Sequence, residues 1–148
     1  MSELFLGIDV GTYSSKAVLT DVTGRIVDEA VVQHDMDVPY PGWAEQDADR
    51  VWWNDVVALC HELVVRPSRD PATIAGVGVS AIGPCLLPLD EDGRPLRNGI
   101  LYGVDTRATA EGEELTAAIG RNELLRFSKM EFTSQAIGPK ILWLQRNE

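Results

Sequence analysis

Residues 7–16 read GIDVGTYSSK, and this stretch decides the fold that we expect. An apolar run ends in a carboxylate at Asp9, Gly11 lets the backbone turn tightly, and a strand-like pattern resumes at Lys16. Such a hairpin tip can turn the backbone N–H groups of Gly11, Thr12 and Tyr13 toward a phosphate, as an anion-binding concavity. The stretch lacks the Gly-Lys-Ser/Thr ending of a Walker loop. An ordinary hairpin with a Gly-Thr turn is the competing interpretation of these ten residues taken alone.

The segments around this hairpin predict a mixed α/β domain. Its sheet opens with a three-stranded antiparallel meander, and helices lie on its faces. The three strands, joined by short turns, are expected at residues 4–10, 16–21 and 26–32. A helix with apolar residues at helical spacing follows, capped by Asp47 or Asp49, and residues 73–80 predict another buried strand. This order resembles the opening of the ribonuclease-H-like domain of the actin-like ATPases.

The second half of the chain predicts further strands and helices. The strands are expected at residues 85–89 and 99–102, and the helices at residues 106–119 and 138–146. The last helix is cut at Asn147 and Glu148 without the Gly or Pro that commonly ends a helix. We therefore interpret residues 1–148 as one domain that is incomplete at its end.

Composition narrows the class of protein and the kind of partner. The chain has 148 residues, of which 45% are hydrophobic and 24% charged, as in soluble globular proteins. Its formal charge of −10 argues against nucleic acid or an anionic membrane as a partner, because both favour clustered Lys and Arg. No apolar run approaches the roughly 20 residues of a spanning helix, and the first residues do not resemble a secretion signal. A cytoplasmic protein is expected.

The hairpin also carries side chains suited to phosphate chemistry. The hydroxyls of Thr12 and Ser14 add donors beside the backbone N–H groups, and Lys16 could bring positive charge close to phosphates. Asp9 is placed to hold a hydrated Mg²⁺, which binds one or two carboxylates together with phosphate oxygens and keeps several waters.

The glycines at residues 76–78 and the two histidines give weaker indications of a functional site. Residues 76–78, Gly-Val-Gly, do not have the spacing of a dinucleotide-binding fingerprint, and close packing of strands explains these glycines better. His34 and His61 lack partners at metal-ligand spacing. A surface or satisfied histidine is the default interpretation for each.

Four segments together resemble the FGGY carbohydrate kinases, the family of xylulokinase, glycerol kinase and gluconokinase, with xylulokinases nearest. The segments are residues 7–16, residues 41–47 (PGWAEQD), residues 100–107 (ILYGVDTR) and residues 132–144. The PGWAEQD string is the most specific, because the wider actin-like superfamily shares the hairpin but not this string. The resemblance covers the whole chain, and the order of the segments is that of the family.

The resemblance implies a fold of two actin-like domains around a cleft. The sugar would lie mostly on the first domain and ATP mostly on the second, which this chain does not include. Asp9 would organise Mg²⁺, and the general base would lie beyond this chain. The residues that would face the nucleotide phosphates are Gly11, Thr12, Tyr13, Ser14 and Lys16.

Two departures from the family pattern fall near the expected sugar site. Xylulokinases and glycerol kinases carry polar side chains in the loop after residue 80, where this chain has Ile82, Gly83 and Pro84. The approach to the Asp-x-Arg motif at Asp105 also contains one extra residue. The substrate site is expected to include these four residues, but the identity of the substrate does not carry over.

The sequence therefore predicts the N-terminal portion of a xylulokinase-like enzyme that transfers the γ-phosphoryl group of Mg·ATP to a hydroxyl of a sugar or ketose. The fragment alone is expected to be inactive. The alternatives are a kinase of the same family for another sugar or polyol, a nucleotide-binding switch of the actin or chaperone type, and a non-catalytic relative. The expected partners are ATP and the sugar or polyol, with no nucleic acid or membrane; a homodimer of the full-length protein is left open.

Overall fold

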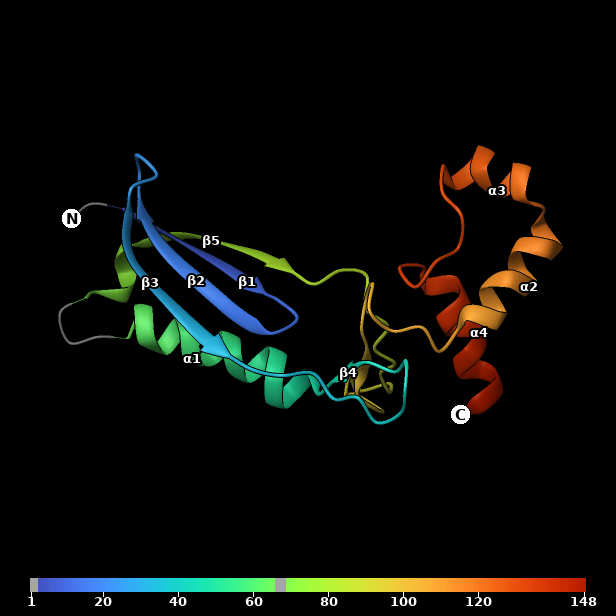
Figure 1. Ribbon diagram of the computed structural model, residues 1–148. Coiled ribbons are helices and arrows are strands. Elements are labelled where there is room, and N and C mark those ends of the chain that lie inside the picture. Colours follow the sequence, from blue (N-terminus) through green and yellow to red (C-terminus); the bar gives the residue numbers. More distant parts are fainter. Residues whose placement is uncertain (1–2, 66–68) are drawn as a thin grey trace. The chain divides into compact units, whose positions relative to one another are not determined.

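The computed structural model describes residues 3–65 and 69–148 (Figure 1). It divides into two compact units. Unit 1 consists of Met1–Met36 and Asp47–Ile82, and unit 2 consists of Asp37–Gln46 and Gly83–Glu148. Each unit is built from two separate stretches of sequence. The expectation of a single domain over the whole chain stays a prediction.

Unit 1 is organised around one four-stranded mixed sheet. Its strands are β1 (Leu4–Val10), β2 (Ser14–Asp21), β3 (Ile26–Gln33) and β5 (Ile74–Ala81). The order in the sheet is β3-β2-β1-β5. β1 pairs antiparallel with β2, β2 pairs antiparallel with β3, and β5 lies parallel to β1. The expected α/β class, with a mixed sheet, is confirmed.

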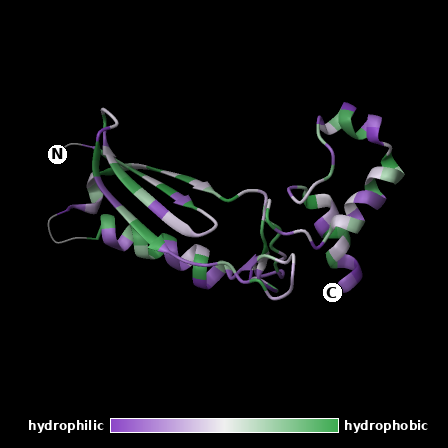
Figure 2. Ribbon diagram, viewed as in Figure 1, coloured by the Kyte–Doolittle hydropathy of each residue, from purple (hydrophilic) through white to green (hydrophobic). Residues whose placement is uncertain are grey.

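One face of this sheet packs against helix α1 (Asn54–Leu63), as Figure 1 shows. Alternate residues of β1 are buried on that face because successive side chains of a strand point to opposite sides. Leu59 and Leu63 of α1 are fully buried against them. Green apolar segments alternate with white and purple ones along these strands in Figure 2. The opposite face of the sheet carries Asp9.

The helical segment begins where the sequence predicted, but with a different first turn. Asp47 caps it: its Oδ1 accepts the N–H groups of Asp49 and Arg50 at 3.0 and 2.9 Å. Residues Ala48–Trp53 (η1) form a π-helical turn before α1 begins. Of the two predicted caps, Asp47 is the one that the structure contains.

β5 is one of the two edge strands of the sheet, and it leaves apolar side chains in solvent. Val77 and Val79 have 62% and 66% of their surface exposed. In register they stand beside Leu6 and Ile8, whose side chains are buried under α1. The helix therefore covers β1 but not the same face of β5.

Unit 2 contains two short strands and three helices. The strands β4 (Glu45–Gln46) and β6 (Gly99–Ile100) pair antiparallel. The helices are α2 (Thr109–Ile119), α3 (Arg121–Ser128) and α4 (Ile137–Asn147). α2 packs against both α3 and α4. Ile100, Ala108 and Trp143 form the buried core of this unit.

Two sequence expectations for unit 2 need correction, and one helix was not expected. The strand expected at residues 85–89 is reduced to isolated bridges at Leu86 and Leu89, because Pro84 and Pro88 have no N–H for a ladder. The helix expected from residue 106 begins at Thr109. α3 was not predicted; Gly120, at φ +89°, separates it from α2.

A buried arginine joins three distant segments of unit 2. The Arg107 guanidinium is fully buried, and its central carbon lies 4.0 Å from the ring centre of Trp43 and 5.0 Å from that of Trp143. Its Nη2 donates to Asp105 Oδ2 at 2.7 Å. Its Nη1 lies 2.7 Å from Glu45 Oε1, with the geometry of an ion pair rather than a hydrogen bond.

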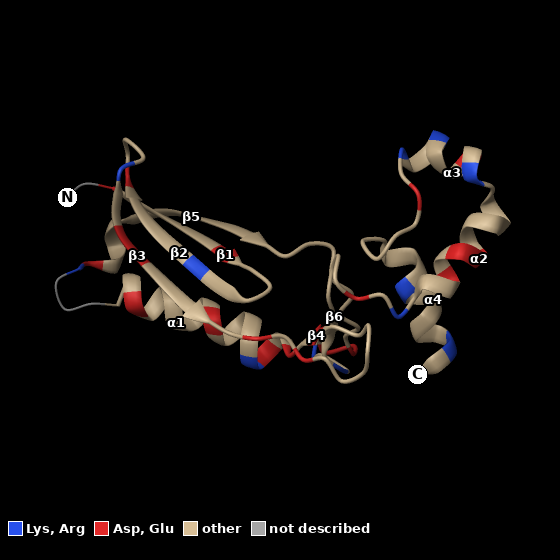
Figure 3. Cartoon of the chain, in the orientation of Figure 1, with Lys and Arg blue, Asp and Glu red and all other residues tan. Residues whose placement is uncertain are grey.

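Charged residues are spread over both units (Figure 3). Asp9 is the acidic residue of β1, and Lys16 the basic residue of β2; they stand opposite each other in register. Within residues 3–65 and 69–148, no helix is both long and apolar enough to cross a membrane.

We predict that Arg107→Met destabilises the chain by about 3–5 kcal/mol, because it leaves the buried carboxylate of Asp105 without its paired cation and leaves Glu45 with Arg97 alone. Urea unfolding followed by circular dichroism measures the loss. Arg126→Met is the matched control, since Arg126 pairs with Glu123 on the surface, where water and salt screen the interaction and such pairs contribute little to stability. Equal unfolding midpoints for the two variants would contradict this role of Arg107.

Candidate functional site

The tip of the β1–β2 hairpin is a tight turn that requires glycine at one position. The N–H of Gly11 donates to the Ser14 carbonyl at 3.0 Å and closes the turn. A Cβ at Gly11 would stand 2.7 Å from that same carbonyl oxygen, too close for any side chain. The expectation that the Gly11 N–H faces a phosphate therefore needs correction. Gly11 contributes the shape of the turn, and its own N–H is already used.

The other predicted tip residues lie at or beside the turn. Thr12 and Tyr13 form its two central positions, and the Tyr13 side chain is 55% exposed. Ser14 begins β2. Lys16, two residues further, points to the same face of the sheet as Asp9. The structure thus brings together the hairpin residues that the sequence singled out.

Asp9 lies on the open face of the sheet among small residues. It is exposed, with Lys16 opposite it on β2 and Ser80 beside it on β5. Gly7 and Gly78 flank it on the same face, and nothing lies within 4 Å of a Cβ built at Gly78. A shallow cavity of about 460 Å³ is lined by these residues. The missing side chains at the two glycines keep the carboxylate accessible.

The residues around Asp9 could hold a Mg²⁺ ion that is also bound to phosphates, but they could not enclose one by themselves. Among the described residues, no group of three or more Asp, Glu, His or Cys side chains could enclose a metal. A single exposed carboxylate next to a turn that is predicted to face phosphates suits a Mg²⁺ that takes its remaining ligands from phosphates and water. The donor set is compatible with a phosphate-bound ion and not with a protein cage.

A hydrogen-bonded cluster lies beneath the turn, and sequence reasoning did not find it. Ser15 Oγ donates to Asp55 Oδ2 at 2.6 Å, and His34 Nδ1 lies 2.7 Å from the same oxygen. His34 Nε2 lies 3.1 Å from the Gly11 carbonyl. The default interpretation of His34 as a satisfied histidine is confirmed. Its partners lie far along the chain, so no local spacing pointed to them.

The residues expected at the sugar site fall in both units. The Ile82 N–H donates to the Val10 carbonyl at 2.7 Å, which places Ile82 at the end of β1 in unit 1. Gly83 and Pro84 are exposed and begin the second stretch of unit 2. Asp105 belongs to unit 2 and is 1% exposed. Its Oδ2 accepts the Ala44 N–H at 2.7 Å, so what the structure shows is a structural role. Substrate contact by these four residues stays a prediction.

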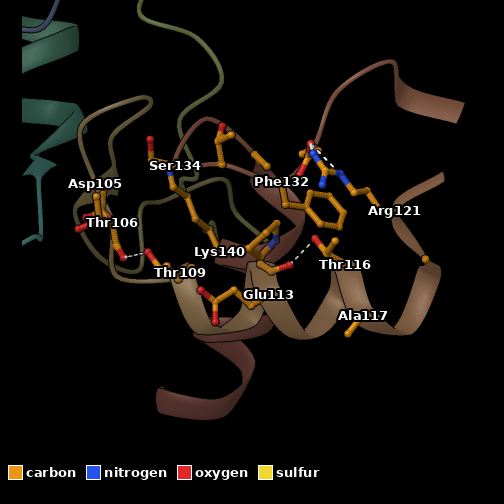
Figure 4. A pocket seen from close by; sticks show the side chains of 17 residues that line it. Asp105, Thr106, Thr109, Glu113, Thr116, Ala117, Arg121, Phe132, Ser134 and Lys140 are labelled. Atoms are coloured by element: carbon orange, nitrogen blue, oxygen red, sulfur yellow. Dashed lines mark hydrogen bonds and ion pairs between the residues drawn. The ribbon is translucent and has the colours of Figure 1, made fainter. Parts of the chain in front are cut away.

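Unit 2 contains a cavity of about 590 Å³ between α2, the segment before α4, and α4 itself (Figure 4). Three hydroxyls on its wall already donate to backbone carbonyls: Thr109 to Thr106, Thr116 to Gly112, and Ser134 to Gly103. This wall therefore has few donors left for a sugar.

Lys140 lies at the base of the same cavity and is fully buried. Its Nζ donates to the Leu101 carbonyl at 2.6 Å. Burial lowers the pKa of Lys140 from its ordinary value, and the nearby Asp105 carboxylate opposes that shift. The ammonium group is hydrogen-bonded to the backbone of unit 2.

The N-terminal domain of the FGGY family of carbohydrate kinases matches residues 4–148. The chain belongs to this family. It is 34% identical to glycerol kinase 2 of Streptomyces coelicolor over 143 residues, which cover 95% of this chain and 27% of that protein. It is 32% identical to xylulose kinase of Lactococcus lactis over 143 residues, which cover 97% and 28%.

Solved structures of the same family share the fold. The crystal structure of xylulose kinase from Rhodospirillum rubrum matches with a TM-score of 0.90 and 30% identity, over 99% of this chain and 30% of that one. Plasmodium falciparum glycerol kinase with ADP matches with a TM-score of 0.89 and 26% identity, over 99% and 29%. This FGGY chain thus spans less than a third of the length of these relatives.

Proposed function

We propose that this chain forms the N-terminal part of an ATP-dependent kinase that phosphorylates a hydroxyl of a sugar, ketose or polyol. The observation that carries the proposal is the hairpin of unit 1. It places an accessible carboxylate, Asp9, on the open face of the sheet beside a glycine-dependent turn and opposite Lys16. Membership of the FGGY family supports phosphoryl transfer as the reaction. The family order of all four sequence segments favours a kinase over a nucleotide-binding switch.

In this proposal the hairpin positions the phosphates and the ion that they carry. Mg²⁺, when bound with ATP, would neutralise charge on the transferred phosphoryl group. Asp9 would orient the hydrated ion, and Lys16 would offset the negative charge of the phosphates. Thr12, Tyr13 and Ser14 would surround the phosphates at the turn. Catalysis would then consist mainly of positioning and charge neutralisation.

We predict that Asp9→Asn in the full-length protein lowers turnover about 100-fold or more at saturating Mg·ATP, with little change in unfolding midpoint. The reason is that Asp9 is exposed and serves the ion rather than the core. Release of ADP measures turnover. Glu29→Gln is the matched control, because Glu29 is an exposed acid of the same sheet, on β3. Near-normal turnover of Asp9→Asn would remove Asp9 from the proposed machinery.

The substrate is proposed to differ from those of the named relatives. Ile82, Gly83 and Pro84 offer no hydrogen-bonding side chains at the loop where xylulokinases and glycerol kinases have them. A site without matching donors does not compensate the desolvation of substrate hydroxyls, and each missing bond is worth roughly 1 kcal/mol.

We therefore expect D-xylulose and glycerol to be weak substrates of the full-length protein compared with another sugar or polyol. A panel of ketoses, aldoses and polyols, compared by kcat/KM, ranks the candidates. If D-xylulose comes out best by a wide margin, the argument from this loop is wrong and a xylulokinase-like substrate stands.

We further propose that this chain is one part of the catalytic protein. The chain covers less than a third of its relatives, and its sheet leaves Val77 and Val79 of the edge strand β5 exposed, as a surface for further chain would be. The general base and the adenosine-binding domain would lie in that further chain.

We predict that these 148 residues alone release no ADP in response to any sugar. Phosphoryl transfer needs donor, metal and acceptor aligned in a closed site, and effective molarities of roughly 10⁵ M are lost when one wall is missing. The test compares the isolated chain with the full-length protein in the same ADP assay and sugar panel. Sugar-stimulated ADP release by the isolated chain, near the rate of the full-length protein, would show that the base has been misplaced.

A further inference from the structure

The cluster beneath the hairpin connects three elements of unit 1 to the turn. Ser15 comes from β2, Asp55 from α1 and His34 from the end of β3, and all three side chains are buried. His34 reaches the turn twice. Its ring Nε2 lies 3.1 Å from the Gly11 carbonyl oxygen, and its backbone N–H donates to the Tyr13 carbonyl at 3.1 Å. His34 therefore contacts the backbone carbonyls of Gly11 and Tyr13, one before the Thr12–Tyr13 tip and one at its end.

The donors and acceptors of this cluster determine where its protons lie. A backbone carbonyl can only accept, so Nε2 of His34 must carry a hydrogen to bond Gly11. Oδ2 of Asp55 already accepts from Ser15, and as a carboxylate oxygen it accepts from Nδ1 as well. A hydrogen between Nδ1 and Oδ2 and another on Nε2 satisfy both contacts of the ring.

The bond to the Gly11 carbonyl also fixes the peptide that follows it. In a planar trans peptide the C=O of one residue and the N–H of the next point in opposite directions. A Gly11 carbonyl held down toward His34 therefore directs the Thr12 N–H upward, away from the buried cluster. The orientation of this amide follows from a side chain that itself lies behind the turn.

We propose that His34, anchored by Asp55, is a positioning residue for the phosphate-binding turn. It holds the Gly11 carbonyl away from the phosphates and orients the Thr12 amide toward them. This inference rests on the proposed function, because it assigns the turn to nucleotide phosphates. It adds a residue outside the hairpin, from the end of β3, to the set that determines how ATP is held.

Two substitutions separate positioning from mere anchoring. His34→Gln places an amide N–H near the position of Nε2, so it can still bond the Gly11 carbonyl while it loses the contact with Asp55. His34→Asn does the reverse, because its shorter side chain can bond Asp55 but cannot reach Gly11. A structural role requires the bond to Asp55 and predicts the greater loss in His34→Gln. A positioning role requires the bond to Gly11 and predicts the greater loss in His34→Asn.

The experiment measures kinetics and Mg·ADP binding by calorimetry on the full-length protein. We expect His34→Asn to lower kcat/KM for ATP and Mg·ADP affinity about 10- to 100-fold, with KM for the sugar unchanged, and His34→Gln to recover most of the loss. His61→Asn, an exposed histidine of α1, is the control and is expected to match the parent protein. Equal constants for the Gln and Asn variants, or a larger loss in the Gln variant, overturn the proposal.

Calorimetry keeps this result separate from the proposed activity. If no sugar stimulates ADP release but Mg·ADP affinity falls in His34→Asn and returns in His34→Gln, the kinase proposal fails and the role of His34 stands. If the full-length protein phosphorylates a sugar while the two variants behave alike, the kinase stands and the role of His34 falls. A full-length protein that does not bind Mg·ADP overturns both.

Discussion

A guanidinium buried without access to solvent is the constraint on which unit 2 depends. Removing such a charge from water is costly, so the surrounding chain must supply opposite charge and polarisable faces. For Arg107 they come from segments far apart: Glu45 and Trp43 from one, Asp105 from a second, Trp143 from a third. These are the strings that gave the family resemblance after the hairpin. The contacts that the structure shows for them are packing and charge compensation within unit 2.

The chemistry gathers in unit 1, on a sheet that is covered on one face and open on the other. α1 buries the apolar side of β1, and the glycines beside Asp9 leave the other side accessible. The same helix also supplies Asp55, so one element supports the core and the turn together. A change that shifts α1 would therefore alter both stability and the shape of the hairpin tip.

The parts of the structure that sequence reasoning anticipated are those set by local rules. Strand alternation, the glycine turn and the Asp47 cap depend on neighbouring residues, and all three are present. The contact of His34 with Asp55 spans 21 residues and follows no recurring spacing, so nothing local indicated it. Residues 85–89 were expected to form a strand because they are mostly apolar. Pro88 within this range and Pro84 just before it lack the N–H that a strand ladder needs, so only isolated bridges form. The Gly11 N–H was expected to be available to a phosphate, but it donates to the Ser14 carbonyl within the turn. A sequence pattern does not show which backbone groups of a turn bond to each other.

The division of unit 2 into two stretches of sequence has a consequence for synthesis on the ribosome. Residues 37–46 emerge between two parts of unit 1, long before the residues that cover them. The Ala44 amide meets the Asp105 carboxylate 61 residues later, a wait of roughly 3 to 12 s at ordinary translation speed. During that interval the indole of Trp43 has no guanidinium to stack on. The nascent chain passes through a stage in which all residues of unit 1 have been synthesised while this aromatic loop still lacks the residues that pack on it.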